Sequence, residues 1–301
     1  MPLAPPFLKP NDKVAIIATA RKVSTNEMKA PIKLLNRWGL QVVTSPYLFD
    51  ADNQFAGDDG VRTNALQWAL DDKSIKAIFI ARGGYGTIRL IDNIDFTKFA
   101  KKPKWIVGFS DITVLHSHIE KKLKIQTLHA PMPITFDRNK TSTNYLKQAL
   151  FGELQSYQIE NDCSLNRTGK ATGKLVGGNL SLLYAMQGSK SDIKTNNKIL
   201  FIEDLDEYLY HIDRMIISLK RSGKLAKLKG LVVGSMIDMK DNIIPFGKTP
   251  QQIILDAIKE YNYPVVFNFP SGHDTQNYPL KLGATIQLSV TESQCKIIFS
   301  K

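Results

Sequence analysis

The segment that decides the fold reads Trp105-Ile-Val-Gly-Phe-Ser-Asp-Ile-Thr-Val-Leu115. The apolar residues 105–108 predict a strand, and the spacing of apolar residues over 112–122 predicts a helix, with Ser110 on the turn between them. A serine there lies at a helix N-terminus, where free N–H groups and the macrodipole favour developing negative charge. This arrangement is typical of a serine nucleophile, although Ile112 stands where such turns usually carry a second glycine. The alternative is that Ser110 merely caps the helix.

Strand and helix patterns alternate on both sides of this turn. Residues 14–19 form an apolar run typical of a strand buried on both faces, and further strands are predicted at 41–44, 77–81 and 125–128. Helices are predicted after a capping box of Ser24 and Glu27, over 58–70 and over 87–91. Pro31 lies inside the first helical pattern and predicts either a kink or a later start. The alternation predicts a mostly parallel sheet covered by helices.

The chain changes character after residue 150. Residues 151–168 are polar with weak periodicity, and we expect a linker there. The pattern then resumes with short strands at 173–179, 199–202, 231–233 and 264–267, helices ending near Gly223 and over 250–260, and a closing antiparallel pair at 284–290 and 294–299. The sequence therefore predicts an α/β protein with an N-terminal parallel-sheet domain over 1–150 and a C-terminal mixed α/β domain over 169–301.

The composition narrows the classes of partner. The chain has 301 residues, 43% of them hydrophobic, and a formal net charge of +12. The lysine clusters at 101–104 and 220–229 contain no aromatic residues that could stack on bases, so we expect a solvated basic surface and no nucleic-acid partner. Cys163 and Cys295 form no disulfide or metal motif. Without a signal-peptide pattern or about 20 consecutive apolar residues, we expect a cytoplasmic protein with no membrane partner.

Three further segments place polar groups just beyond predicted strands. The loop Ala81-Arg-Gly-Gly-Tyr-Gly86 could present N–H groups to an oxyanion or a phosphate, but it lacks the spacing of a nucleotide-binding fingerprint. Acidic residues follow at Glu203-Asp-Leu-Asp-Glu207. The histidines at 116, 118, 129, 211 and 273 lack the spacing of a zinc site, and only His273 follows a glycine in a loop after a strand. Each segment alone is also explained as a tight turn or a solvated loop. Together they give the order serine, acid, histidine of one type of catalytic triad.

In combination these segments resemble the LD-carboxypeptidase family (peptidase family S66), which also includes the microcin C self-immunity hydrolases. The resemblance covers nearly the whole chain. The chain departs from the family pattern at Thr19-Ala20, where a Pro-Ser pair is usual. The segments that carry it are Leu8-Lys-Pro-Asn-Asp-Lys-Val14, Arg82-Gly-Gly-Tyr-Gly86, Gly108-Phe-Ser-Asp111, Gly177-Gly-Asn-Leu180, Phe201-Ile-Glu-Asp204, Tyr210-His-Ile-Asp-Arg-Met215 and Gly272-His273.

The resemblance implies a flavodoxin-like N-terminal domain that carries the serine and a C-terminal domain that carries the acid and the histidine. The site would then lie between the two domains. By residue match, Ser110 is the nucleophile, His273 the base and Glu203 the acid that orients the imidazole. The backbone N–H groups of Gly84 and Asp111 form the oxyanion hole. The resemblance implies neither a metal nor a cofactor.

A second carboxylate competes for the role of orienting acid. Glu207 lies four residues beyond Glu203. We prefer Glu203 because it directly follows the predicted strand 200–202, and a residue that orients an imidazole has to be held firmly. Glu207 lies closer to a predicted helix, where a carboxylate favours the positive end of the helix dipole.

The resemblance also implies a substrate. It is a murein peptide whose terminal D-alanine is linked to the L-centre of a diamino acid, cleaved by a serine carboxypeptidase during peptidoglycan recycling. The family further suggests a homodimer. Two alternatives stay open: a microcin-type hydrolase that cleaves a peptidyl or aminoacyl nucleotide, and a non-catalytic module that binds a phosphorylated ligand through the glycine loop.

Overall fold

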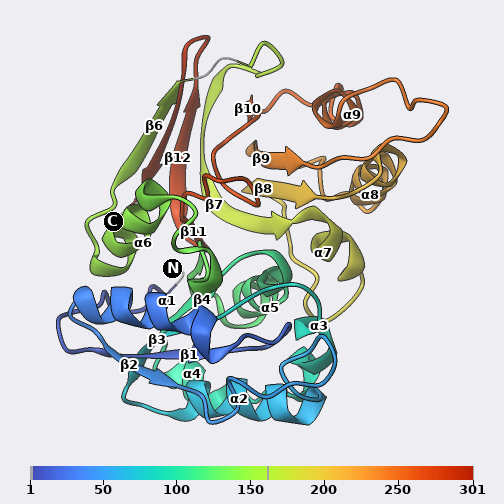
Figure 1. The fold of residues 1–301 in the computed structure, drawn as a ribbon. Coiled ribbons are helices and arrows are strands. Elements are labelled where there is room, and N and C mark those ends of the chain that lie inside the picture. Colours follow the sequence, from blue (N-terminus) through green and yellow to red (C-terminus); the bar gives the residue numbers. More distant parts are fainter. Residues whose placement is uncertain (1–2, 161–162, 301) are drawn as a thin grey trace.

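The protein is described from a computed structural model, and the description covers residues 3–160 and 163–300. Figure 1 shows two sheets, one above the other, each flanked by helices. The elements of the first half of the chain lie mostly in the lower part of the figure. They are β1 (Lys13–Ile17), α1 (Thr25–Arg37), β2 (Gln41–Thr44), α2 (Asp59–Asp71), β3 (Ile75–Ile80), α3 (Thr87–Leu90), η1 (Ile91–Asn93), α4 (Thr97–Lys101), β4 (Trp105–Gly108), η2 (Ser110–Ile112), α5 (Thr113–Leu123), β5 (Thr127–His129), η3 (Pro133–Thr135) and α6 (Lys140–Phe151).

The first sheet confirms the predicted parallel architecture. Its strand order is β11-β5-β4-β3-β1-β2, and β1 to β5 all run parallel. The order 2-1-3-4-5 of these strands is that of flavodoxin-like sheets, in which ligands bind beyond the carboxyl ends of the strands. The edge strand β11 (Leu280–Leu282) comes from near the C-terminus and pairs antiparallel with β5. The second half of the chain therefore completes the sheet of the first.

The first helix begins where its capping box predicts. Ser24 accepts a hydrogen bond from Glu27 N, the Glu27 side chain bonds back to Ser24 N, and α1 starts at Thr25. The helix continues through Pro31 to Arg37, so the predicted later start is wrong. A capping box satisfies two of the N–H groups that a helix start leaves unpaired, which fixes the start of α1.

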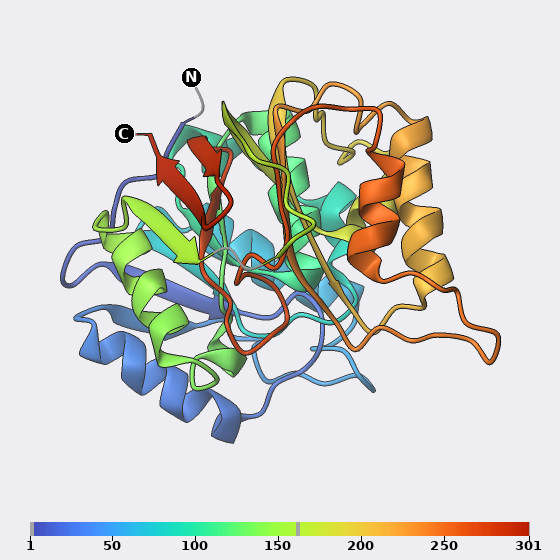
Figure 2. The same ribbon diagram turned by 90° about the horizontal axis from the view of Figure 1, so that it is seen from above.

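The second sheet is mixed. Its strand order is β10-β9-β8-β7-β12-β13-β6, with β7 to β10 parallel and the remaining pairs antiparallel. Seen from above, β6, β12 and β13 lie at one end and α8 and α9 at the other (Figure 2). The elements are β6 (Ser156–Glu160), β7 (Gly169–Asn179), α7 (Leu180–Ala185), β8 (Lys198–Leu205), α8 (Leu209–Arg221), β9 (Gly230–Ile237), α9 (Pro250–Ala257), β10 (Val265–Val266), β12 (Thr285–Val290) and β13 (Gln294–Phe299).

The structure differs from the predicted linker over 151–168. Residues 156–160 form the edge strand β6, which pairs antiparallel with β13, while residues 161–162 lie outside the described part of the chain. The sequence does not predict this strand, because an edge strand is exposed along much of its length. Only Tyr157 is fully buried in it, so its apolar pattern is too short to stand out.

The two halves meet where α5 packs against the end of β7. Thr113 opens α5, and its hydroxyl accepts a 2.9 Å hydrogen bond from Asn179 N at the end of β7. Gly178 has a φ of 141°, and a Cβ atom there would lie 2.5 Å from the Thr113 hydroxyl. The glycine therefore permits the close contact between the helix that follows Ser110 and the second sheet.

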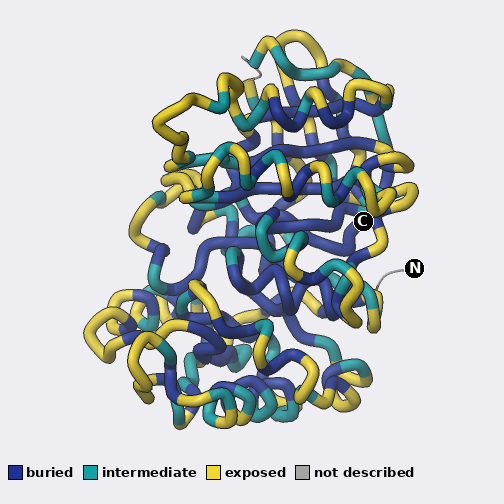
Figure 3. The backbone as a smooth tube through the Cα atoms, turned by 90° about the vertical axis from the view of Figure 1, so that its right-hand side faces the viewer, coloured by how far each residue is buried: buried dark blue, intermediate teal, exposed yellow. Residues whose placement is uncertain are grey.

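The buried residues lie mainly along the two sheets. Figure 3 shows buried segments through the middle of both parts, with exposed residues mainly in the outer helices and loops. Within residues 3–160 and 163–300, no helix has the length and apolar character needed to cross a membrane.

Candidate active site

Ser110 occupies the turn that the sequence predicts. β4 ends at Gly108, and Ser110 opens the short 3-10 helix η2, which leads into α5. Its φ is 64°, in the left-handed region that residues other than glycine rarely adopt. Such strain occurs mainly where the surrounding structure imposes it, often at functional sites. The caps of η2 and α5 are Phe109 and Ile112, so the alternative role of Ser110 as an N-cap is wrong.

Two hydrogen bonds join the three residues predicted as the triad. His273 Nε2 lies 3.0 Å from Ser110 Oγ, and His273 Nδ1 lies 2.6 Å from Glu203 Oε2. Ser110 follows β4 of the first sheet, Glu203 lies in β8 of the second, and His273 lies in the loop after β10. The structure therefore brings together side chains from both halves of the chain.

The loop before His273 depends on a glycine. Gly272 has a φ of 130°, and a Cβ atom there would lie 2.3 Å from Ser235 Oγ and 2.9 Å from Glu203 Oε2. Ser235 Oγ in turn accepts a 2.8 Å hydrogen bond from His273 N. The ring of His273 packs edge-to-face on Phe109, with 4.8 Å between ring centroids. Backbone and ring of His273 are thus both held by neighbouring groups.

Glu203 corrects the sequence analysis in one respect. It does not follow the strand 200–202, because β8 continues to Leu205, with an irregular register against β9 between Ile202 and Asp204. The strand continues through two acids because both have partners. Glu203 is fully buried against His273, and Asp204 accepts hydrogen bonds from Asn179 Nδ2 at 2.8 Å and from Leu205 N at 2.9 Å.

The competing acid Glu207 bonds a different histidine. Its Oε2 lies 2.5 Å from Nδ1 of His211, in the first turn of α8. Both side chains are partly exposed, and no hydrogen bond joins either of them to Ser110 within the described residues. The geometry therefore favours Glu203 as the acid that contacts His273.

The environment of His273 sets it apart from the other buried histidines. Burial lowers the pKa of His273, but the negative charge of Glu203 and its hydrogen bond outweigh burial, so the pKa lies above its ordinary value. Burial alone dominates elsewhere: it lowers the pKa of His116 to about 4 and that of His129 well below the ordinary value. Burial also lowers the pKa of His118. Among the histidines of the described residues, only His273 combines a carboxylate partner with a contact to Ser110.

The two predicted oxyanion donors lie in connected loops beside Ser110. A Cβ atom on Gly83 would lie 3.5 Å from Ser110 Oγ, so the glycine loop packs directly on the serine. The N–H of Asp111 comes before the first bonded N–H of η2, so η2 gives it no partner. Neither this N–H nor that of Gly84 has a hydrogen-bond partner in residues 3–160 and 163–300. The Asp111 carboxylate accepts a 2.9 Å hydrogen bond from Thr87 N. This bond ties the glycine loop to the turn of Ser110.

A buried arginine anchors the same loop. Arg62 is 1% exposed, pairs with Asp59 and donates a 3.0 Å hydrogen bond to Thr19 O. The hydroxyl of Thr19 lies 2.8 Å from that of Thr87, at the start of α3. The departure from the family pattern at Thr19 therefore supplies a side-chain contact that proline could not make.

A second buried link escaped the sequence analysis. Asn179 bonds Thr113 through its backbone and Asp204 through its side chain, and Ser181 N donates to Asp204 Oδ2 at 2.9 Å. Burial, with the adjacent charge of Glu203, raises the pKa of Asp204 to about 7. The motifs Gly177-Gly-Asn179 and Glu203-Asp204 contain these residues, but no spacing rule connects segments 25 residues apart.

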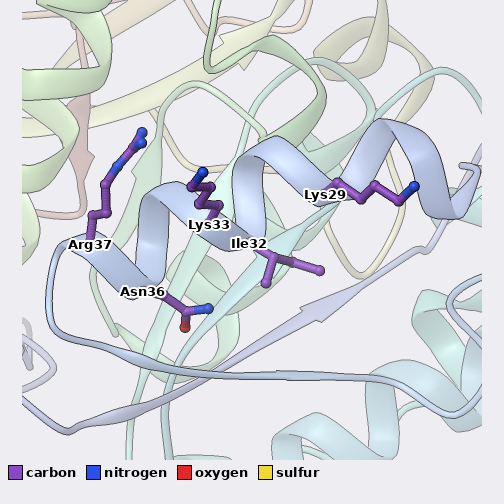
Figure 4. Close-up of a pocket in the computed structure, with 5 residues that line it drawn as sticks. All are labelled: Lys29, Ile32, Lys33, Asn36 and Arg37. Carbon is purple, nitrogen blue, oxygen red and sulfur yellow. The ribbon is translucent and has the colours of Figure 1, made fainter.

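In the described residues, the larger surface hollows are not lined by Ser110, Glu203 or His273. The one in Figure 4 has a volume of about 510 Å³ and is lined by five residues of α1: Lys29, Ile32, Lys33, Asn36 and Arg37. It contains none of the predicted site residues. Within the described parts of the chain, no group of three or more His, Cys, Asp or Glu residues could hold a metal ion.

Comparison with known proteins identifies the family. Models of the LD-carboxypeptidase N-terminal and C-terminal domains match residues 14–130 and 172–288. A probable murein peptide carboxypeptidase of Bacillus subtilis (strain 168) is 34% identical over 302 residues, which are 97% of this chain and 93% of that protein.

Solved structures share the fold. A muramoyltetrapeptide carboxypeptidase from Oxalobacter formigenes has a TM-score of 0.86 at 27% identity, covering 96% of this chain and 99% of that one. The microcin C7 self-immunity protein MccF, in complex with aspartyl sulfamoyl adenosine, has a TM-score of 0.87 at 20% identity, covering 100% and 99%. Because both domain models match in order and a relative matches over nearly its full length, the chain belongs to the LD-carboxypeptidase family of peptidases.

Proposed function

We propose that the protein is a serine-type LD-carboxypeptidase that removes the terminal D-alanine from murein tetrapeptides. The observation that carries the proposal is the chain of hydrogen bonds from Ser110 through His273 to Glu203, at 3.0 and 2.6 Å. A nucleophile, a base and an orienting acid in this order activate a serine without a metal.

In the proposed mechanism Ser110 Oγ attacks the carbonyl carbon of the scissile peptide bond while His273 Nε2 takes its proton. Glu203 holds the imidazole through Nδ1 and stabilises the imidazolium that forms. The carbonyl oxygen becomes an oxyanion that the N–H groups of Gly84 and Asp111 stabilise. Losing one such donor typically costs about 2.7–4 kcal/mol of transition-state stabilisation.

The second half of the reaction returns the enzyme to its starting state. His273 gives its proton to the amine of the leaving D-alanine, and the C–N bond breaks. Water, deprotonated by His273, then attacks the acyl-enzyme. The bond between the acyl carbon and Ser110 Oγ breaks, His273 returns the proton to Oγ, and the shortened peptide leaves with a new carboxylate. The Ser110 turn fits this scheme, because Ile112 N and Thr113 N are hydrogen-bonded within the turn, whereas Asp111 N has no hydrogen-bond partner among the described residues and is left for the developing charge.

The substrate is proposed from the relatives. Proteins named as murein peptide and muramoyltetrapeptide carboxypeptidases match this chain over more than nine-tenths of its length. Murein peptides are anionic, and the net charge of +12 would favour their approach. We place the reaction in cytoplasmic peptidoglycan recycling by a homodimer; fractionation of cells and sedimentation of the purified protein test these two points.

The test is D-alanine release from defined tetrapeptides that carry lysine or diaminopimelate at the third position. We expect release by the wild type and none by Ser110→Ala. An aminoacyl sulfamoyl adenosine is assayed in parallel, because a structural neighbour was solved with such a compound. Cleavage of the nucleotide alone would assign the microcin-type activity. Failure to cleave any of these compounds, with no reaction of Ser110 toward a fluorophosphonate, would leave a binding module.

A further inference from the structure

A narrow crevice lies beside the Ser110–His273 pair. Phe109 and Gly272, the residues that precede Ser110 and His273, both line it, together with Arg138 and Asn277. Its volume is about 10 Å³, which is room for a single water-sized group. The crevice can thus admit an oxygen atom of a ligand but not a side chain.

The cation of the crevice is the guanidinium of Arg138. Arg138 is exposed and forms no ion pair with any residue in the described parts of the chain. By contrast, Arg82 of the glycine loop lies 3.6 Å from Glu27. Asp274, which also lines the crevice, uses its Oδ1 to accept a 2.6 Å hydrogen bond from Thr275 N. The Arg138 guanidinium is therefore available to an anion from outside the chain.

A second donor in the crevice also lacks a partner. Asn277 is 5% exposed, and its Nδ2 has no hydrogen-bond partner among the described residues. Its orientation is fixed, because Oδ1 accepts from Gly272 N at 3.1 Å and from Ser271 Oγ at 3.4 Å. Leaving a buried donor unpaired typically costs about 1–3 kcal/mol, which a ligand oxygen would recover.

The reaction itself places an anion on this side of the serine. His273 must reach the amine of the leaving residue in order to protonate it, so the leaving residue lies next to His273. In a terminal residue the carboxylate is bonded to the same carbon as that amine. The positive charge of Arg138 acts on His273, where it lowers the pKa against the larger effect of Glu203.

We propose that Arg138, backed by the Asn277 side-chain amide, binds the C-terminal carboxylate of the substrate and so restricts cleavage to the last residue of a peptide. The inference rests on the proposed carboxypeptidase function. A guanidinium suits the role because it donates two parallel hydrogen bonds to a carboxylate, and such charge-assisted bonds are about twice as strong as neutral ones.

The test pairs a change in the enzyme with a change in the substrate. Wild type, Arg138→Gln and Arg138→Lys are assayed on a murein tetrapeptide and on the same peptide with an amidated C-terminus. We expect Arg138→Gln to lower kcat/KM for the peptide with a free C-terminal carboxylate about 10- to 100-fold, chiefly through KM. For the amidated peptide, kcat/KM should change by less than about threefold. Arg138→Lys should recover part of the loss, because it keeps the charge but not the fork of donors.

A matched control separates a local contact from general charge. Arg37→Gln makes the same chemical change on α1, in the hollow of Figure 4, and should leave the acid-to-amide ratio of the wild type unchanged. The proposal would be overturned if Arg138→Gln lowered kcat/KM equally for the free and the amidated peptide, or lowered it for neither. Failure of the proposed function is a different result, since the wild type would then release no D-alanine.

Discussion

Residues 3–160 and 163–300 contain two glutamate–histidine pairs that differ in surroundings rather than in chemistry. Glu203 and His273 lie 2.6 Å apart with side chains 0% and 11% exposed, and the second imidazole nitrogen contacts Ser110. Glu207 and His211 lie 2.5 Å apart with side chains 22% and 29% exposed, and they are four residues apart in the sequence. The comparison shows that a carboxylate–histidine contact alone does not define a triad. Burial and the third partner distinguish the two pairs.

The largest difference is expected when each histidine is removed. His273→Ala should lower kcat by about 10⁶-fold, because the base and the proton donor are lost together. His211→Ala should leave most of the activity, since it contacts Glu207 and not Ser110. D-alanine release from one tetrapeptide, with melting curves for both variants, measures this. Equal losses in two folded variants would contradict the distinction between the pairs.

Replacing each of the two acids should give a smaller difference in kcat. Glu203→Gln keeps the shape of the side chain but removes the charge that holds His273 in the reactive tautomer, and a comparable change in a serine triad costs about 10⁴ in kcat. Glu207→Gln should change kcat far less. Steady-state rates of both variants on the same peptide provide the check. If Glu207→Gln is the inactive variant, Glu203 is not the orienting acid.

The pH dependence should also separate the pairs. Glu203 raises the pKa of His273 above the ordinary value of a histidine, and a general base acts only when unprotonated, so kcat/KM should rise with pH through a midpoint above that ordinary value. In Glu203→Gln the raising charge is gone and burial dominates, so the midpoint of the residual activity should fall. Glu207→Gln should keep the wild-type midpoint. Initial rates across the pH range measure the midpoints of the wild type and the two variants. If the midpoint of Glu203→Gln equals that of the wild type, Glu203 does not set the pKa of His273.

The smallest effect concerns the backbone of Ser110. Its left-handed conformation strains any residue with a Cβ atom, so Ser110→Gly should be more stable than Ser110→Ala by about 0.5–1 kcal/mol, although both should be inactive. Denaturant unfolding of the two variants measures the difference. A glycine variant that is less stable than the alanine variant would show that the turn stores no strain.

The sequence predicts the serine and the histidine better than the acid, for a physical reason. Ser110 and His273 lie in loops after short apolar strands, and the carboxyl ends of parallel strands are where α/β folds gather functional groups. Glu203 lies inside a strand. Its burial depends on His273, 70 residues further along the chain, which no local pattern reports.

Other features depend on tertiary pairing in the same way. The strand β11 has only three residues and acquires its place by pairing with β5, about 150 residues earlier in the chain. Arg138 and Asn277 lie in loops, and only the folded chain places them in one crevice. The family motifs located the segments of the site, but the contacts between them required the structure.

The most direct test of the triad is labelling with a fluorophosphonate, followed by mass spectrometry of the peptides. A serine activated by a neighbouring base reacts with such a reagent, whereas an ordinary surface serine does not. We predict a single adduct on Ser110 in the wild type and in Glu207→Gln, no adduct in Ser110→Ala, and much slower labelling in His273→Ala. An adduct on a different residue, or equal labelling of wild type and His273→Ala, would contradict the account that Ser110 is activated through His273 and Glu203.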